Sequence, residues 1–275
     1  MSNHFDPFAR SYLFVPGSRP DRIAKALDSG AHAVIVDLED AVAPEEKIVA
    51  RQQVDAWLKD HPARQILLRI NAIGTPWHHA DLRLATAPNV VGVVLPKAEH
   101  AQALSLIADK PVLPIIESAL GFAQVDAIAA HPATRRLIFG TYDFRADLGL
   151  GQSEEALLYF ASRLVLVSRV AGLAPPVDGV MANLSQESGW LTEARRAREL
   201  GFGGKLCIHP RQVTAVNAGF APSEEEIRWA KKMVEGAGNR ATAVIDGEFV
   251  DRPVLLRAKA IIDQIKQLAS IGARS

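Results

Sequence analysis

Two acidic residues, Glu117 and Asp143, stand shortly after apolar segments, 112–116 and 137–139, that are typical of buried strands and are separated by a helix-like segment. Parallel strands joined by a crossover helix point the same way, so the residues after both strands emerge at the same end of the sheet. Neighbouring carboxylates repel each other unless a cation lies between them. We therefore predict that Glu117 and Asp143 bind Mg²⁺, for which Mn²⁺ could substitute, with water completing the coordination. The alternative is that each acid only stabilises a helix N-terminus.

The elements that must position these acids alternate regularly between strand-like and helix-like segments. Near-continuous apolar segments predict parallel strands that are buried on both faces, and segments of helical periodicity lie between them. The predicted strands are 12–15, 33–38, 66–70, 90–95, 112–116, 137–139, 177–181 and 205–208, and the clearest helical segments are 20–29, 45–59, 99–108, 154–170 and 189–200. Eight such units predict an α/β fold, a TIM (β/α)₈ barrel over residues 1–220, with an open doubly wound sheet as the alternative.

Residues 221–275 lie outside this eightfold pattern. An acid-rich helix start follows Pro222 and Ser223, residues 243–250 have the pattern of a hairpin, and a terminal helix begins at Asp251 and extends to about residue 270. We interpret this segment as a C-terminal helical lid or arm that packs on the barrel or on a neighbouring subunit.

Charged residues follow several of the predicted strands, where the loops of an α/β barrel build the active site. Arg69 and Lys97 would bind a substrate carboxylate or stabilise a developing oxyanion. The acidic residues after the second strand are too closely spaced for all to bind metal, so we expect them to orient metal-bound water or Arg69; they are Asp37, Glu39 and Asp40. The alternative for Arg69 is a structural ion pair with Asp37 or Glu39.

Two weaker signals concern the first and last strands. Arg19, Arg22 and Lys25 follow Gly17 at the mouth of a helix, which is a reasonable site for a phosphate group. His209, after the eighth strand, is a candidate base, although a histidine that ends a buried strand is more often hydrogen-bonded structure.

Composition excludes several classes of function. The 275 residues include 31 Lys plus Arg and 31 Asp plus Glu, and this zero net charge gives no electrostatic case for binding nucleic acid. Cys207 is the single cysteine, so no intrachain disulfide or cysteine-based zinc site can form. The sequence contains neither a secretory signal pattern nor an apolar run of the roughly 18 residues needed for a membrane helix, and the expectation is a cytoplasmic protein that does not bind membranes.

The motifs together resemble the citrate lyase beta subunit-like family of the HpcH/HpaI aldolase superfamily, which also contains malyl-CoA and citramalyl-CoA lyases. They are RSYLFVPG (10–17), DLEDAV (37–42), RIN (69–71), LPKAE (95–99), IES (116–118), GTYD (140–143), IHP (208–210) and VDRP (250–253). The resemblance implies a barrel with a lid, Mg²⁺ held by Glu117 and Asp143, and a homotrimer or hexamer. It also implies that Arg69 contacts the substrate and that Asp251 is the acid/base, delivered by the lid of an adjacent subunit. The sequence departs from relatives at 183–186, where they often have an acidic loop.

From these residues we expect a Mg²⁺-dependent carbon–carbon lyase that cleaves a malyl-, citramalyl- or citryl-CoA-like 3-hydroxyacyl thioester to a 2-oxo acid and an acetyl thioester. Arg10, Arg19 and Lys97 are the further residues expected to bind the substrate or coenzyme A. Three alternatives stay open: a thioesterase at the same metal site, a metal-dependent 4-hydroxy-2-oxo acid aldolase, and a non-catalytic thioester-binding protein. The sequence leaves open whether coenzyme A or an acyl carrier protein carries the acyl group.

Overall fold

A computed structural model describes residues 5–107, 110–185, 187–238, 240 and 242–272 of the chain. The chain forms two units, residues 1–220 and residues 221–275. No helix in the described part of the chain is both long and apolar enough to cross a membrane.

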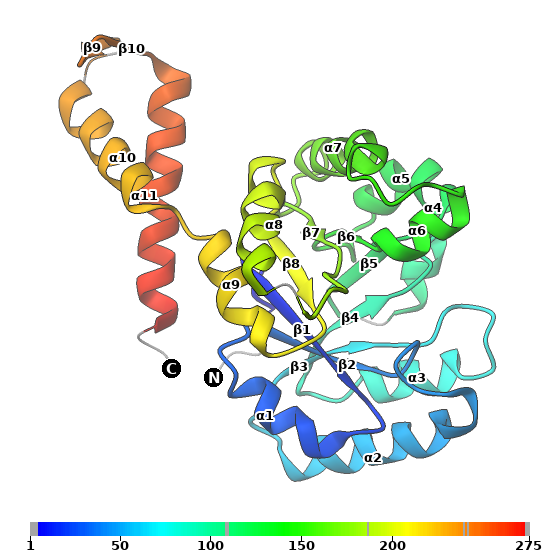
Figure 1. Ribbon diagram of the computed structural model, residues 1–275. Coiled ribbons are helices and arrows are strands. Elements are labelled where there is room, and N and C mark those ends of the chain that lie inside the picture. The colour runs from blue at the N-terminus through cyan, green and yellow to red at the C-terminus, as the bar shows by residue number, and fades with distance from the viewer. Residues whose placement is uncertain (1–4, 108–109, 186, 239, 241, 273–275) are drawn as a thin grey trace. The chain divides into compact units, whose positions relative to one another are not determined.

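The first unit is a closed barrel of eight parallel strands in chain order (Figure 1). The strands are β1 (Ser11–Pro16), β2 (Ala33–Asp37), β3 (Ile66–Arg69), β4 (Val90–Leu95), β5 (Val112–Ile116), β6 (Ile138–Phe139), β7 (Val177–Asp178) and β8 (Gly204–Cys207). Strand β1 pairs with both β2 and β8, which closes the sheet. The predicted TIM barrel is therefore confirmed, and the open doubly wound sheet is excluded.

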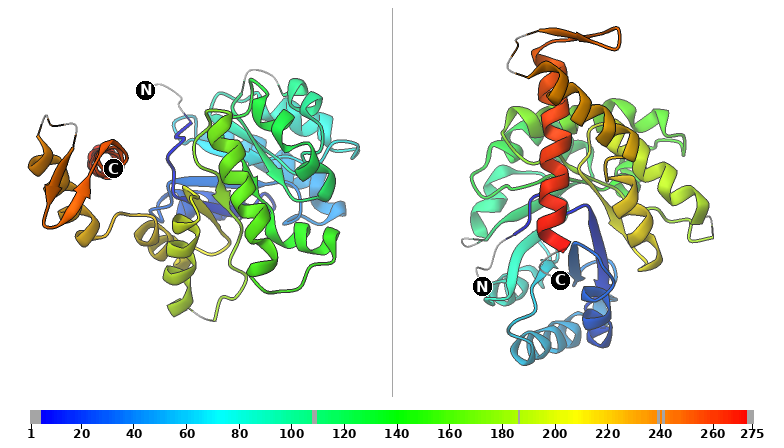
Figure 2. Two further views of the ribbon diagram at one scale, coloured as in Figure 1. Left: turned by 90° about the horizontal axis from the view of Figure 1, so that it is seen from above. Right: turned by 90° about the vertical axis from the view of Figure 1, so that its left-hand side faces the viewer.

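Helices surround the barrel, as the two further views in Figure 2 show. They are η1 (Pro20–Arg22), α1 (Ile23–Leu27), η2 (Pro44–Glu46), α2 (Lys47–Asp60), α3 (His78–Ala85), η3 (Ala101–Leu106), α4 (Ala119–Ala123), α5 (Val125–Ala130), α6 (Thr141–Leu148), α7 (Glu155–Val170), α8 (Glu187–Glu199) and α9 (Arg211–Gly219). One apolar cluster fills the space between the strands and these helices, and a second fills the barrel interior. Such a packed interior leaves the ends of the barrel as places for a site.

Two elements differ from the sequence prediction. The segment predicted as a helix over 99–108 forms only the 3₁₀ helix η3, and its last residue lies outside the described residues. Strand β7 is shorter than the predicted 177–181, because its neighbour β6 has two residues and is followed almost at once by α6. Beyond Asp178 the chain has no partner strand on that side.

A buried arginine fills the N-terminal end of the barrel. Arg136 is fully buried and donates hydrogen bonds to the carbonyl oxygens of Ala9 and Pro175, both at 2.6 Å, and to the hydroxyl of Tyr12 at 2.8 Å. A Cβ at Gly203 would lie only 2.5 Å from Arg136 Nη2, so the chain must approach the guanidinium closely there. The N-terminal end of the barrel is therefore closed by protein atoms.

The second unit contains α10 (Glu224–Ala237), α11 (Arg252–Gly272) and a hairpin of β9 (Ala243–Ile245) and β10 (Glu248–Val250). Ser223 and Glu226 form a capping box at the start of α10. Asp246 and Gly247 both have positive φ, as a tight two-residue hairpin turn requires. The two helices and the hairpin share a small apolar core of their own. The proposed role of this unit as a lid or arm stays a prediction.

Candidate functional site

A cavity of about 340 Å³ lies at the C-terminal end of the barrel and is lined by five of the charged residues that the sequence singled out. Glu117, Asp143, Arg69, Asp37 and Asp40 all line it. Their positions follow from the sheet register, because Asp37 pairs with Arg69 across β2 and β3. On the other side of the barrel, the last residues of β5 and β6 pair in the same way.

Glu117 is a buried acid of the cavity wall that is held from two sides. It is 5% exposed, and its Oε1 accepts a hydrogen bond from the backbone N–H of Lys97 at 2.6 Å. Lys97 donates this bond from the left-handed region, with φ of 48°, which is an unfavourable conformation for a non-glycine residue. On the β6 side, a Cβ at Gly140 would lie 2.5 Å from Glu117 Cβ and 2.6 Å from Glu117 Oε2. The backbone N–H of Lys97 thus fixes the side chain of Glu117 on one side. On the other side, Glu117 occupies space that is free only because Gly140 has no side chain.

Replacing Gly140 with alanine is expected to displace the Glu117 carboxylate. Neither the Glu117 Cβ nor the third close atom, Ile115 Cγ2 at 2.8 Å, can move freely, because both belong to the barrel wall. We expect a loss of stability of about 1–3 kcal/mol from overpacking and at least a roughly tenfold weaker affinity for Mg²⁺. Thermal unfolding and Mn²⁺ titration followed by electron paramagnetic resonance measure the two effects.

Gly189 provides the matched control. It lies in the first turn of α8, and an added Cβ there meets no atom within 4 Å. Gly189→Ala should leave metal affinity unchanged and slightly raise stability, since alanine favours helix over glycine. Equal metal affinity in Gly140→Ala and Gly189→Ala would show that Gly140 does not position Glu117.

The donor set at Glu117 and Asp143 fits a magnesium ion. Burial raises the pKa of Glu117 to about 8; the N–H of Lys97 opposes this rise, while Glu39 and Asp143 add to it. A divalent cation would supply the positive charge that this buried carboxylate lacks. Within the described residues, no group of three or more His, Cys, Asp or Glu is arranged to hold a metal. Two carboxylates with open positions for water and substrate oxygens are typical of Mg²⁺.

The raised pKa of Glu117 predicts a pH-dependent response to Mg²⁺. Without metal, the unfolded chain ionises this group near pH 4.5 and the folded protein only near pH 8, so stability falls as pH rises across that window. Glu39, with its pKa raised to about 7 mainly by burial, acts in the same direction. Mg²⁺ binds the ionised form, so the melting temperature increase caused by Mg²⁺ should grow from about pH 5 to about pH 8. Calorimetry of Mg²⁺ binding, carried out in buffers of different ionisation enthalpy, should detect the protons that the protein releases when the metal binds. If the increase in melting temperature caused by Mg²⁺ were independent of pH, the prediction would be contradicted.

Arg69 is held in the cavity wall by a network of acids. Its Nε and Nη2 donate to the two carboxylate oxygens of Asp37 at 2.7 and 2.6 Å, and its guanidinium lies over the ring of Phe14. Nη1 is 3.2 Å from Glu39 Oε2 and 3.6 Å from Asp40 Oδ2. Burial alone would lower the pKa of Arg69, but the ion pair with Asp37 outweighs it and raises the pKa. Arg69 therefore forms the structural ion pair that the sequence offered as the alternative, and it also lines the cavity; its contact with a substrate stays a prediction.

The loop after β2 is held by contacts that the sequence did not reveal. Asp37 accepts hydrogen bonds from the backbone N–H groups of Glu39 and Ala41, which fold the loop around its carboxylate. The buried ammonium of Lys47 donates to the carbonyl oxygens of Leu38 and Glu39 at 2.9 and 2.8 Å. A lysine in a helical segment is normally exposed, so the sequence did not predict that Lys47 is buried and holds this loop. It also did not predict the close approach of Gly140 to Glu117.

Other predicted residues lie apart from this cavity. Arg10 precedes β1, at the opposite end of the barrel, where it donates to the carbonyl oxygen of Asn217 at 2.9 Å; this placement gives no support for substrate binding by Arg10. Arg19 follows β1 and pairs with Asp21 on the surface. The Lys97 side chain is 53% exposed, with its ammonium 3.7 Å from Glu39. His209 Nδ1 accepts a hydrogen bond from the Arg211 N–H.

Asp251 belongs to the second unit and stands at the start of α11. Its Oδ1 accepts a hydrogen bond from the backbone N–H of Val254 at 3.3 Å, in the manner of a helix cap. The predicted acid/base role of Asp251 stays a prediction.

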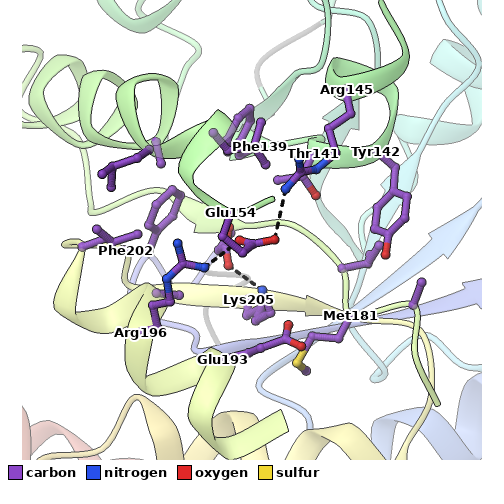
Figure 3. Close-up of a pocket in the computed structure, with 18 of the residues that line it drawn as sticks. Phe139, Thr141, Tyr142, Arg145, Glu154, Met181, Glu193, Arg196, Phe202 and Lys205 are labelled. Atoms are coloured by element: carbon purple, nitrogen blue, oxygen red, sulfur yellow. Dashed lines mark hydrogen bonds and ion pairs between the residues drawn. The ribbon is translucent and has the colours of Figure 1, made fainter. Parts of the chain in front are cut away.

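A second cavity, of about 160 Å³, lies beside the first and shares Phe139, Thr141, Tyr142 and Val180 with it. Figure 3 shows its charged side chains facing one another across the space. Their ion pairs, drawn as dashed lines, join Glu154 to Arg145 and Arg196, and Lys205 to Asp178.

Comparison with known proteins identifies the family of this chain. Residues 10–210 match the family described as HpcH/HpaI aldolase/citrate lyase. The chain is 33% identical to a (3S)-malyl-CoA thioesterase of Cereibacter sphaeroides, over 99% of this chain and 100% of that protein.

Two solved structures from Mycobacterium tuberculosis share the fold. The chain is 32% identical to the protein CitE in complex with magnesium, acetoacetate and coenzyme A, with a TM-score of 0.84 over 94% of this chain and 99% of that one. It is also 32% identical to a citrate lyase beta subunit complexed with oxaloacetate and magnesium, with a TM-score of 0.71 over 78% of this chain and 99% of that one. The chain therefore belongs to the HpcH/HpaI aldolase/citrate lyase family.

Proposed function

We propose that this protein is a Mg²⁺-dependent carbon–carbon lyase that cleaves a 3-hydroxyacyl thioester to a 2-oxo acid and an acetyl thioester. The observation that carries the proposal is the presence of Glu117, Asp143 and Arg69 in the wall of one cavity. Relatives with magnesium, coenzyme A and oxo acids in their crystals support the same assignment. Free coenzyme A is the proposed carrier, and an acyl carrier protein is the alternative carrier.

The charged groups of the cavity have distinct tasks in this reaction. Glu117 and Asp143 would hold Mg²⁺, which would supply Lewis-acid stabilisation to the substrate hydroxyl as that hydroxyl gives its proton to solvent water. When the carbon–carbon bond breaks, its electron pair moves into the thioester as an enolate and the hydroxyl carbon becomes the carbonyl of the 2-oxo acid. Arg69, held by Asp37, stabilises the enolate oxygen. Asp251, in its protonated form, then gives its proton to the enolate carbon and regains one from solvent, and the acetyl thioester leaves.

Asp251 precedes α11 in the second unit, and we propose that an adjacent subunit of a trimer or hexamer supplies it. Asp251→Asn should then lose the exchange of acetyl-CoA methyl protons with D₂O, because the amide cannot remove or return a proton. Proton nuclear magnetic resonance measures the exchange. Mg²⁺ binding should be unchanged in this variant; retained exchange would remove Asp251 from the mechanism.

A thioesterase is the second candidate, because the relative from Cereibacter sphaeroides carries that activity in its name. Incubation with Mg²⁺ and malyl-, citramalyl- or citryl-CoA, followed by mass analysis, separates the two. A lyase yields acetyl-CoA and a 2-oxo acid, whereas a thioesterase yields free coenzyme A and the intact hydroxy acid. Cleavage of 4-hydroxy-2-oxo acids without coenzyme A would indicate the aldolase, and no turnover of any of these compounds would leave a thioester-binding protein.

A further inference from the structure

Strands β2 and β3 end at the ion pair in the wall of the main cavity. Asp37 and Arg69 are the last residues of the two strands that pair in register, and the Leu38 N–H then donates to the Arg69 carbonyl oxygen at 2.9 Å. From Leu38 the chain continues into the loop of residues 38–41, which folds around the Asp37 carboxylate. Because Asp37 holds Arg69 by two hydrogen bonds, a displacement of this loop would also displace the guanidinium.

Asn71 connects the loop after β2 to the loop after β3. Its Nδ2 donates to the Leu38 carbonyl oxygen at 2.9 Å and to Asp81 Oδ2 at 2.7 Å. The Asn71 backbone N–H donates to the same Asp81 oxygen at 2.9 Å, and its carbonyl oxygen accepts a hydrogen bond from His78 Nδ1 at 2.8 Å. Asn71 is buried and stands two residues after Arg69. Its backbone and its amide are therefore both held beside the ion pair.

Asp81 sets the orientation of the Asn71 amide. It is fully buried in α3, and its Oδ1 accepts a hydrogen bond from Arg51 Nε of the adjacent helix α2 at 2.6 Å (Figure 1). The Arg51 guanidinium supplies the cationic partner that a buried carboxylate requires. An ionised carboxylate only accepts hydrogen bonds, so it selects the NH₂ group of Asn71 and not its oxygen.

Lys47 is the second donor to the same carbonyl oxygen. Its buried ammonium binds the carbonyl oxygens of Leu38 and Glu39, so Leu38 accepts hydrogen bonds from both Asn71 and Lys47. A buried carbonyl that loses its donors is costly, and this loop would have to move to find others. Asn71, Lys47 and Asp81 are not among the described residues that line either cavity, so they act from behind the wall.

We infer that Asn71, Lys47 and Asp81 are positioning residues that hold Arg69 in place for the reaction. The inference rests on the proposed function, in which Arg69 stabilises the enolate oxygen. These residues act through the loop of residues 38–41 and Asp37, and contact neither the substrate nor the metal. A donor to a developing oxyanion must be held within about 0.5 Å of its productive position, and a misplacement of about 1 Å can cost about 100-fold in rate.

The first test compares Asn71→Ala with a matched control, Asn89→Ala. Asn89 is also buried, and its Nδ2 donates to the carbonyl oxygens of Leu58 and His61 at 3.0 and 3.1 Å, but it precedes β4 and so lies at the opposite end of the barrel. Both variants should have lower melting temperatures. Asn71→Ala should lower kcat about 10–100-fold with unchanged KM and Mn²⁺ affinity, whereas Asn89→Ala should keep the wild-type kcat. Equal kcat in the two variants would overturn the inference for Asn71.

A second pair keeps the inference testable if Asn71→Ala does not fold. Lys47→Met preserves most of the side-chain length and removes the ammonium. Lys110→Met is its control, because Lys110 donates to the carbonyl oxygens of Ala87 and Val90 at 3.0 and 2.7 Å, just before β5. We expect kcat to fall at least about fivefold in Lys47→Met only. A wild-type kcat in Lys47→Met would count against the inference.

A double-mutant cycle tests whether the effect passes through Arg69. If Asn71 only positions Arg69, adding Asn71→Ala to Arg69→Lys should lower kcat by less than about threefold, because the contribution of the guanidinium is already lost. Multiplication of the two single effects would show that Asn71 acts by another route and would overturn the inference.

Hydrogen exchange at Arg69 separates this inference from the proposed function. The Arg69 side chain is 11% exposed and its Nε–H is bound to Asp37, so its side-chain ¹⁵N resonance, assigned by its loss in Arg69→Lys, should exchange slowly with solvent. Exchange should be at least about tenfold faster in Asn71→Ala and unchanged in Asn89→Ala. Faster exchange would support the inference even if no thioester were cleaved. Unchanged exchange would refute it and leave the proposed lyase intact.

Discussion

Glu117→Gln is expected to abolish Mg²⁺ binding and to lower turnover by roughly 10³-fold or more, while the metal-free protein becomes more stable. The loss of turnover follows because metal stabilisation of developing charge contributes several kcal/mol. The gain in stability at neutral pH follows because the buried carboxylate, with its pKa raised to about 8, is replaced by a neutral amide. The amide oxygen can still accept the hydrogen bond from the Lys97 N–H.

Three measurements check this prediction: Mn²⁺ binding by electron paramagnetic resonance, turnover with malyl- or citramalyl-CoA, and thermal unfolding between about pH 5 and pH 8. Glu45→Gln, at an exposed acid of η2, is the matched control and should change none of them. A variant that lost activity because it had misfolded would melt at a lower temperature, so opposite changes in activity and stability distinguish the two causes. An unchanged Mg²⁺ response in Glu117→Gln would reject Glu117 as a ligand.

Arg69→Lys is expected to lower kcat by about 10²–10³-fold without removing Mg²⁺ binding. Lysine keeps the positive charge but cannot repeat the two parallel hydrogen bonds of Arg69 to Asp37, and it lacks the planar group that lies over Phe14. Loss of one positioned donor at a developing oxyanion has effects of this size. Because the metal ligands are separate residues, the Mg²⁺ titration should be preserved.

Arg64→Lys is the control for the same chemical change at the surface. Arg64 pairs with Asp28 in an exposed ion pair, which contributes little, so activity and melting temperature should stay unchanged. A wild-type kcat in Arg69→Lys would mean that Arg69 only holds the acidic loop. A lower affinity for substrate with unchanged kcat would mean that it binds substrate and transition state equally.

Sequence pattern was sufficient to predict the barrel and the end of it at which the acidic residues and Arg69 gather. Buried parallel strands read as continuous apolar segments, and eight of them in alternation with helices leave few architectures. The same topology places the residues after each strand at one end, so the sequence itself assigns Glu117, Asp143 and Arg69 to one cavity. The prediction was least accurate for short elements. Strand β7 ends at Asp178 instead of at residue 181, and the segment predicted as a helix over 99–108 forms only a 3₁₀ helix.

Tertiary structure alone decided how the site residues are held. The close approach at Gly140, the left-handed backbone of Lys97 and the burial of Lys47 all depend on contacts between segments distant in the chain, which leave no local pattern. Arg10 illustrates the opposite case: its motif is continuous with β1, yet it lies before the strand and so at the other end of the barrel. Strand order and direction follow from residue periodicity, but side-chain packing and charge pairing depend on distances between elements, and only the folded chain sets those.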